Sequence, residues 1–371
     1  MSAVLDLFLE LAAIPSPPGS ERPVADAVLA YLRELGVETD EDGCGPSIGS
    51  DMGNIYCRLP GGDANGTPLF LCAHLDTVPP QGSIEPIVAD GVVRNAAGTI
   101  LGADDKAAVA VMLEAARRLL AENRPHAGVE LLFTPMEEVG LLGAEAFDHA
   151  RFEARLGYVY DMAAPIGQII LGAPSQRTLK VRFHGRAAHA GMFPEEGRSA
   201  IAAAAHAIAD LRLGRIDEET SANVGLITGG SARNITPEWC SFEAEVRSHD
   251  EGKLAEVVQE ILDACTFAAS VADCGVETEV SETYRGYRLR PDEPAVAVAA
   301  EALRRCGFVV ETALTGGAAD ANVFNMRGLP CVNLANGMAA IHTPDEHIAV
   351  ADLEAMVEVT LAIIEAARDA A

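Results

Sequence analysis

Three short apolar runs, each followed directly by polar side chains, constrain the fold of this 371-residue chain more than any other feature. They span residues 69–73, 129–134 and 158–160, and helical patterns lie between them. A continuous apolar run is typical of a strand that helices bury on both faces, as in parallel sheets. Open α/β sheets hold their functional sites just beyond the carboxyl ends of such strands. The sequence therefore predicts an α/β fold with a site along one edge of the sheet.

The pattern changes near residue 175, where apolar and polar residues begin to alternate. Alternation with a period of two is typical of strands that are exposed on one face. The expected elements are strands at 179–184, 224–228, 240–247 and 276–284, and helices at 198–211 and 251–271. Their order, β-α-β-β-α-β, is the ferredoxin-like arrangement. The first pattern then returns, so we predict an α/β domain of residues 1–174 and 288–371 with an inserted α+β domain at 175–287.

The composition excludes two classes of partner. The formal net charge is −28 and the sequence pI is about 4.6. Nucleic-acid-binding proteins present a basic face, and anionic membranes attract basic segments, so neither partner is expected. The N-terminus lacks the basic start of a signal peptide, and no apolar run is long enough to span a membrane. The eight cysteines form no Cys-x-x-Cys pair, which indicates buried thiols in a reducing compartment, so we expect a cytoplasmic protein.

Five residues of the α/β part carry side chains that bind divalent metals, and each lies after a predicted strand or on a loop. They are His74, Asp104, Glu138, Asp161 and His342. Neutral imidazole and carboxylate are both good zinc ligands. Two histidines and three carboxylates can hold a pair of divalent ions if one carboxylate bridges them, and Asp104 is central in sequence and follows a short glycine turn. Two such ions, about 3.5–4 Å apart, together activate a water molecule and polarise a substrate oxygen.

Each of these residues also has a simpler interpretation. Asp104 and Asp105 directly precede a predicted helix, where aspartate commonly acts as a cap. Glu138 could belong to a solvated helix start, and His342 has a rival ligand in His347. We favour the metal site because all five candidate ligands fall on one edge of the predicted sheet.

Two further acids stand beside candidate ligands and have roles of their own. Asp76 is two residues past His74 and can orient its imidazole, as carboxylates behind metal-binding histidines do. Glu137 is adjacent to Glu138 and is free to act as a general base on the attacking water.

These motifs resemble those of the di-zinc exopeptidases that include peptidase T, glutamate carboxypeptidase and acetylornithine deacetylase. The matching stretches are 73–78, 102–106, 137–140, 160–161 and 341–343, with 184–191 and 229–234 in the predicted insertion. The chain is most similar to the peptidase T-like branch, because deacetylase and carboxypeptidase relatives usually carry a longer carboxylate at the position of Asp161. The resemblance covers essentially the whole chain. It implies a catalytic α/β domain with a mixed sheet and an inserted domain that serves as lid and dimerisation surface.

The resemblance also implies a role for each site residue. One zinc would be held by His74, Asp104 and Asp161, and the other by Asp104, Glu138 and His342. Cobalt and manganese are the alternative metals. In this family the peptide bond between the residues at the positions of Asp104 and Asp105 is typically cis.

Three residues of the predicted insertion are implied to act on the substrate. His189 would polarise the scissile carbonyl or stabilise the oxyanion, a role that fixed electrostatics makes valuable. Asn234 and Arg247 would grip a substrate carboxylate or carbonyl, and the arginine fork suits a bidentate clamp. An exposed strand residue is the simpler interpretation of Arg247.

The function implied by the resemblance is that of a zinc-dependent, tripeptidase-like aminopeptidase that hydrolyses the N-terminal peptide bond of short peptides. A metal-bridging hydroxide, formed with help from Glu137, would attack the scissile carbonyl, and the enzyme would be a homodimer. One alternative is an amidohydrolase that removes the acyl group from N-acyl amino acids. Another is a non-catalytic binding relative, and the intact set of seven site positions argues against it.

Overall fold

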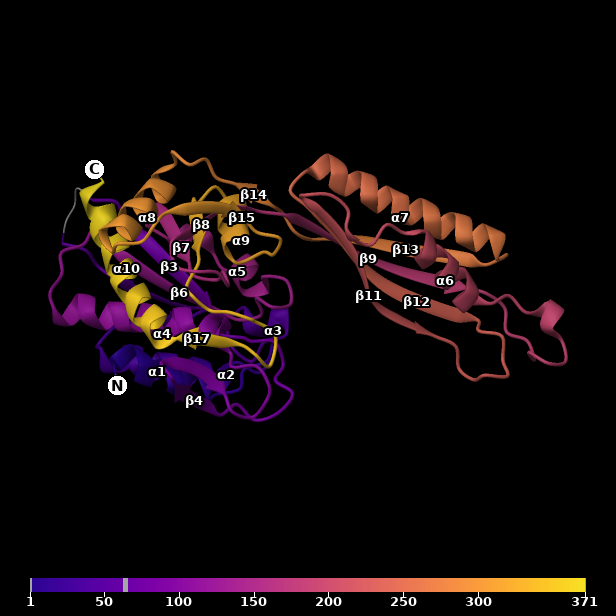
Figure 1. Cartoon of the computed structure of the whole chain (residues 1–371), viewed down its shortest axis with the longest axis horizontal. Coiled ribbons are helices and arrows are strands. Elements are labelled where there is room, and N and C mark those ends of the chain that lie inside the picture. The colour runs from indigo at the N-terminus through magenta and orange to yellow at the C-terminus, as the bar shows by residue number, and fades with distance from the viewer. Residues whose placement is uncertain (1, 63–65, 371) are drawn as a thin grey trace. The chain divides into compact units, whose positions relative to one another are not determined.

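The computed structural model describes residues 2–62 and 66–370 (Figure 1). It divides into two compact units, one of Met1–Gly172 with Arg288–Ala371 and one of Ala173–Tyr287. Both ends of the chain lie in the first unit, where early and late strands stand side by side. Within the described residues, no helix is both long enough and apolar enough to cross a membrane.

The first unit is built on a large mixed sheet. Its strands run in the order β1-β2-β6-β3-β7-β16-β8-β14, and β15 pairs with β8. Their bounds are β1 Thr39–Glu41, β2 Ile55–Leu59, β3 Leu69–His74, β6 Val129–Thr134, β7 Leu156–Val159, β8 Gln168–Ala173, β14 Tyr287–Arg288, β15 Glu311–Leu314 and β16 Cys331–Leu334. The strands β6, β3, β7 and β16 are mutually parallel, whereas β2 and β8 pair with them in the antiparallel sense. The predicted α/β class with a mixed sheet is confirmed.

A second, three-stranded sheet in the same unit has the order β17-β5-β4. Its strands are β4 Pro86–Ala89, β5 Val92–Asn95 and β17 His347–Ala349. The pairing of β17 with β5 ties the C-terminal part of the chain to the segment that precedes the Asp104 turn.

Helices cover the central sheet. Their bounds are α1 Ala3–Ala12, α2 Arg22–Glu34, α3 Gly45–Ile48, α4 Ala103–Ala121, α5 Leu142–Ala146, η1 His149–Arg151, α8 Pro294–Arg305, α9 Ala321–Met326 and α10 Val350–Asp369. Helix α10 packs between α4 and α8, while α4 contacts β3 and α8 contacts β7 and β16. This cover explains why every residue of β3, β6, β7 and β16 is buried, as their continuous apolar sequences predict.

One close approach shows how tightly the central strands pack. Phe70 of β3 stacks on Phe152 at 4.5 Å and meets the edge of Phe324 of α9 at 4.7 Å between ring centroids. A Cβ atom added at Gly157 of β7 would lie 2.0 Å from Cζ of Phe70. Only glycine leaves room for this ring, so the position is determined by packing.

The second unit is a sheet with helices on one face. Its elements are β9 Ser175–His184, η2 Pro194–Glu196, α6 Ala200–Asp210, β10 Gly214–Arg215, β11 Thr220–Gly229, β12 Trp239–Ser248, α7 Glu251–Val271 and β13 Gly275–Tyr284. The strand order is β10-β11-β12-β9-β13. Apart from the short β10, the sequence of elements is the predicted β-α-β-β-α-β.

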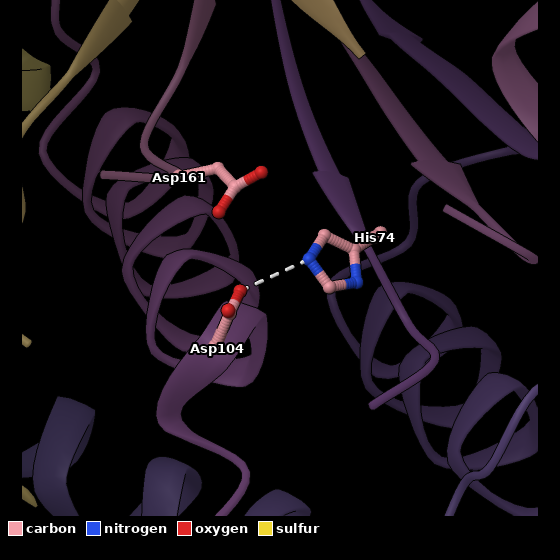
Figure 2. A group of neighbouring side chains, drawn as sticks. All are labelled: His74, Asp104 and Asp161. Carbon is pink, nitrogen blue, oxygen red and sulfur yellow. Dashed lines mark hydrogen bonds and ion pairs between the residues drawn. The ribbon is translucent and has the colours of Figure 1, made fainter. Parts of the chain in front are cut away.

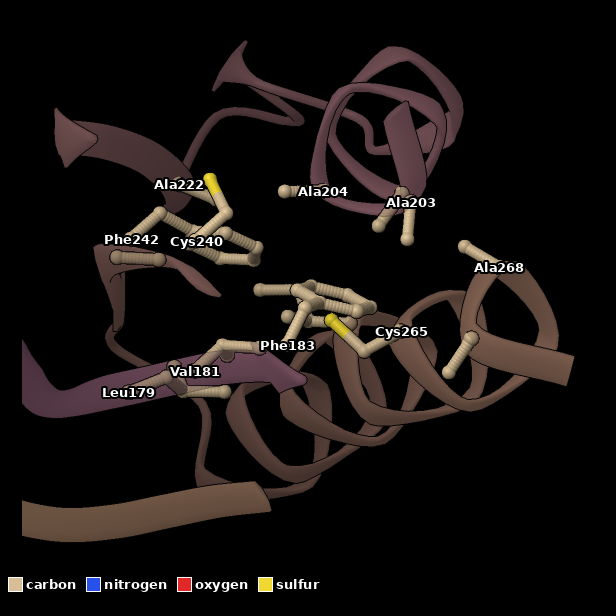
Figure 3. Close-up of a cluster of buried hydrophobic side chains, with 14 of the residues drawn as sticks. Leu179, Val181, Phe183, Ala203, Ala204, Ala222, Cys240, Phe242, Cys265 and Ala268 are labelled. Carbon is tan, nitrogen blue, oxygen red and sulfur yellow. The ribbon is translucent and has the colours of Figure 1, made fainter. Parts of the chain in front are cut away.

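Alternation along β9 places its apolar side chains in the core of this unit. Leu179, Val181 and Phe183 are buried, whereas the intervening Lys180 and Arg182 are exposed. Figure 3 shows Phe183, Phe242 and Cys265 packed between the sheet and the helices α6 and α7. The two-residue period of the sequence therefore corresponds to one covered and one open face.

Candidate metal centre

The predicted metal ligands of the first unit gather at the carboxyl ends of its parallel strands. His74 is the last residue of β3, and Asp161 follows β7. Glu138 lies in the turn after β6, and His342 lies on the loop between β16 and β17. In Figure 2 the side chains of His74, Asp104 and Asp161 point toward one another from two strand ends and the start of α4.

The five side chains form two groups that share Asp104. Nε2 of His74 lies 3.1 Å from Oδ1 of Asp104, and Nε2 of His342 lies 3.1 Å from Oδ2. His342 Nε2 is also 3.1 Å from Oε1 of Glu138. In the groups His74–Asp104–Asp161 and Asp104–Glu138–His342, the potential ligand atoms all lie within 4.8 Å of one another.

This arrangement fits two divalent cations. Ligand atoms about 2.1 Å from one tetrahedral ion are separated from each other by about 3.4 Å, close to the spacing found here. The two oxygens of Asp104 face different histidines, as a bridging carboxylate requires. Imidazole and carboxylate ligands suit zinc, cobalt and manganese alike, so the set of ligands does not select among these metals.

The electrostatics of the cluster also favour cations. Burial raises the pKa of Glu137 and of Asp161 well above the usual range, and neighbouring carboxylates add to the effect. Burial acts in the same direction on Asp104, but hydrogen bonds with His342 and His74 outweigh it and lower the pKa. Hydrogen bonds to Asp104 and Glu138 raise the pKa of His342 to about 10. The cluster therefore brings several carboxylates together in a buried environment, and bound cations would relieve the repulsion among their negative charges.

The acid pair at the start of α4 does not act as a helix cap. Asp104 has φ −82° and ψ 105°, outside the helical region, and both of its oxygens face histidines. Asp105 is buried, and neither of its oxygens has a hydrogen-bond partner among the residues that the structure describes. The capping interpretation of Asp105 is wrong, because a capping carboxylate must accept a backbone N–H of the first turn. The bond between the two residues is cis, as the resemblance implied.

Asp76 contacts more than the histidine that it was predicted to orient. Its carboxylate lies 3.5 Å from Nδ1 of His74, but its backbone carbonyl is closer, at 2.8 Å. The two carboxylate oxygens each accept a backbone N–H at 3.0 Å, one from Glu137 and one from Glu138. The side chain therefore holds the backbone of the Glu137-Glu138 turn, which no sequence pattern indicated.

Two residues that the sequence did not single out hold the backbone of predicted ligands. Asn333 of β16 accepts the N–H of Asp161 at 3.0 Å and donates its amide to the carbonyl of Asp161 at 2.8 Å. Glu346 accepts three backbone N–H groups of the turn that carries Asp104. A single Asn in a strand and a single Glu in a turn have no signature of their own, so only the fold identifies them.

The three predicted substrate residues lie in the second unit. His189 is exposed, and its Nδ1 accepts the N–H groups of Gly191 and Met192, both at 3.2 Å. The exposed Asn234 accepts the N–H of Ala190 through its backbone at 3.0 Å, so the loops of His189 and Asn234 lie together.

Arg247 is in a different environment from these two loop residues. It is half-buried on β12, and its guanidinium donates to both oxygens of Glu245 at 3.1 and 3.0 Å. The simple interpretation of an exposed strand residue is therefore wrong. The fork that would clamp a substrate carboxylate already has an anionic partner within the protein.

Comparisons with known proteins point to one family. A family model for peptidase family M20/M25/M40 matches residues 70–366. Peptidase T of Pectobacterium atrosepticum is 26% identical over 405 residues, covering 98% of this chain and 98% of that protein. The solved structure of aminopeptidase PepT from Bacillus cereus is 37% identical, with a TM-score of 0.87 and 98% of both chains covered. A tripeptidase structure from Staphylococcus aureus is 35% identical, with a TM-score of 0.92, covering 99% of this chain and 98% of that one. The resemblance to peptidase T-like enzymes is confirmed.

Proposed function

The chain belongs to peptidase family M20/M25/M40, and on that premise we propose that it is a zinc-dependent aminopeptidase that cleaves the N-terminal peptide bond of short peptides. The observation that carries the proposal is the pair of three-residue groups that share Asp104. Similar proteins named peptidase T, aminopeptidase and tripeptidase support the choice of substrate class. Asp161 supports it as well, because the longer carboxylate of deacetylase relatives is not present.

The proposed ligands are His74, Asp104 and Asp161 for one ion and Asp104, Glu138 and His342 for the other. Two divalent ions bound there would supply Lewis-acid activation of a water molecule and of the scissile carbonyl. The distances and the charge of the cluster support this assignment.

Glu137 is the proposed general base. Its carboxyl is buried beside the two groups but belongs to neither, and Asp76 holds its backbone. Burial raises the pKa of Glu137, which favours a carboxyl that accepts a proton and releases it again. In the proposed reaction Glu137 takes a proton from the attacking water, and it delivers that proton to the leaving amine as the C–N bond breaks.

Two sets of residues are proposed to contact the substrate. A cavity of about 220 Å³ is lined by His342 and by the apolar residues Val78, Ile100 and Pro344, and it has room for a substrate side chain. His189 and Asn234 lie on two joined, exposed loops, which supports a role in contacting the substrate carbonyl or carboxylate. Arg247 would have to exchange Glu245 for the substrate, so we place it last among the three.

We further propose a cytoplasmic homodimer that associates through the second unit. Beyond its short pairing with β10, strand β11 borders one edge of the sheet, and its Leu226 and Ile227 are 63% and 55% exposed. An open apolar edge strand is a natural place for another chain to pair. All eight cysteines are free thiols, which fits a reducing compartment. Sedimentation of the purified protein as a monomer would contradict the dimer.

A substrate panel with parallel metal analysis tests the proposed activity. Purified protein is assayed with a dipeptide, a tripeptide, a longer peptide and an N-acetyl amino acid, and its zinc, cobalt and manganese contents are measured. We expect fastest release of the N-terminal residue from the tripeptide and about two divalent ions per chain. Preferred hydrolysis of the N-acetyl amino acid would identify an amidohydrolase instead. If the metal-loaded protein hydrolyses none of these substrates, the proposal that it is a peptidase is refuted.

A further inference from the structure

The loop that presents His342 is closed at its base by backbone hydrogen bonds. Ala339 and His347 exchange two of them, with N···O distances of 2.9 and 3.1 Å. Within the loop, Ala340 and His342 have φ angles of 53° and 63°, in the left-handed region that residues with a Cβ rarely adopt. Such conformations persist only where the surrounding structure holds them. The position of His342 therefore depends on how the base of the loop is anchored.

Glu346 provides that anchor. It stands next to the base of the loop, and only 2% of its surface is exposed. Its Oε2 accepts the N–H of Leu101 at 2.7 Å and of Gly102 at 2.9 Å, and its Oε1 accepts the N–H of Asp104 at 3.1 Å. One buried carboxylate thus joins the His342 loop to the turn of Asp104, although more than 240 residues separate them in sequence.

We propose that Glu346 is a positioning residue that fixes His342 relative to Asp104 and thereby sets the affinity for the cation that these two ligands share. The inference rests on the proposed function, because it concerns the same metal ligands. Glu346 hydrogen-bonds no ligand side chain and is in neither ligand group, so it acts through the backbone of the loop and of the turn.

The carboxylate chemistry of Glu346 is essential to this role. Both oxygens accept backbone N–H groups, and hydrogen bonds to a charged acceptor are about twice as strong as neutral ones. A glutamine that keeps its carbonyl oxygen toward Leu101 and Gly102 must turn its NH₂ group toward the N–H of Asp104. Two donors then face each other in a buried environment, and the connection between the His342 loop and the turn of Asp104 is the part that loosens.

A matched control separates this role from a merely structural one. Glu130, at the start of β6, is also buried, and it accepts backbone N–H groups of Glu153 at 3.1 Å and Ala154 at 2.8 Å. It lies at the opposite end of β6 from the turn that carries Glu138. Glu130→Gln therefore removes the same kind of interaction away from the proposed ligands.

The test is a Co²⁺ titration of the full chain after a chelator has removed its metals. Binding is monitored by calorimetry and by the visible absorbance of bound cobalt. We expect wild type to bind two equivalents. Glu346→Gln should weaken one of the two sites about 10- to 100-fold, the usual effect of residues that support metal ligands. Its kcat at saturating cobalt should stay within a few-fold of wild type. Glu130→Gln should lower the melting temperature and leave both cobalt affinities within twofold.

A cobalt titration of Glu346→Gln that matches wild type would overturn the inference and leave the proposed function intact. If Glu346→Gln does not fold, Glu346→Asp replaces it, with a retained charge, a side chain shorter by one methylene and an expected intermediate loss of affinity. An unchanged titration of that variant would equally refute the role. If the wild-type protein binds no cobalt, both the inference about Glu346 and the proposed metal site are refuted. Normal binding without peptide hydrolysis would contradict the proposed function alone.

Discussion

The contacts of Asp76 lead to a prediction that separates two roles for this residue. Its side chain is fully buried, and each carboxylate oxygen holds one backbone N–H of the Glu137-Glu138 turn at 3.0 Å. In Asp76→Asn one oxygen remains, and the new NH₂ group faces the other N–H. The lost charge-assisted bond contributes about 1.5–3 kcal/mol, and the remaining bond becomes a weaker, neutral one that costs about 1 kcal/mol more. The turn is thereby destabilised by about 2.5–4 kcal/mol.

This loss should appear mainly in catalysis. At about 1.4 kcal/mol per factor of ten, it corresponds to roughly a 60- to 700-fold fall in kcat/KM when the displacement of Glu137 is expressed in the transition state. His74 should keep its orientation, because its Nδ1 partner at 2.8 Å is the backbone carbonyl of Asp76, which the substitution leaves in place. Added metal should therefore fail to restore the activity of Asp76→Asn.

The assay measures kcat/KM for a tripeptide across a cobalt titration, with circular dichroism as a check of folding. Wild type and Asp76→Asn are compared at saturating cobalt. Full recovery of the variant at high cobalt would refute the reasoning, because it would mean that the carboxylate acts mainly through His74 and the metal. A variant with unchanged kcat/KM at every cobalt concentration would refute both roles.

Three further substitutions have distinct expected outcomes. Glu137→Gln should keep both metals and lose at least about 100-fold in kcat, whereas Glu138→Gln should lose metal. Metal analysis and kinetics of the two variants distinguish these outcomes, and equal metal loss in both variants would contradict the assignment. Asp105→Asn should retain two metals and fold normally, because the carboxylate oxygens of Asp105 have no hydrogen-bond partner among the described residues. Loss of metal in this variant would mean that Asp105, and not Asp104, is the ligand of the pair. Burial raises the pKa of Asp320 to about 6, so the stability contributed by its protonated carboxyl is present below about pH 4 and is lost as the pH rises through 6. In metal-free protein, the free energy of unfolding of Asp320→Asn relative to wild type, measured by urea denaturation, should therefore rise by about 2–3 kcal/mol between pH 4 and pH 7. A difference that does not change with pH would contradict this prediction.

The parts of the site that could be predicted are those encoded by local patterns. Hydrophobic periodicity marks β3, β6 and β7, and the polar residues after them mark the edge of the sheet where parallel strands end together. His74, Glu138 and Asp161 could therefore be grouped by their positions along the chain. The alternative interpretation of the acid pair as a helix cap does not hold, because it assumes regular helical geometry from the first residue after the turn, and the backbone at Asp104 and Asp105 is not helical.

The order of residues along the chain was enough to specify the fold class, the residue types of the candidate metal ligands and the family of the protein, because hydrophobic pattern and side-chain chemistry are local properties. What holds these ligands in place emerged only from the folded arrangement. Asp76 supports a turn 61 residues away, Asn333 supports Asp161 across 172 residues, and Glu346 supports the Asp104 turn across 242. Each is a single polar side chain whose partners are backbone amides. A backbone amide has the same chemistry at every position, so nothing in the sequence indicates which one a buried carboxylate or amide will meet.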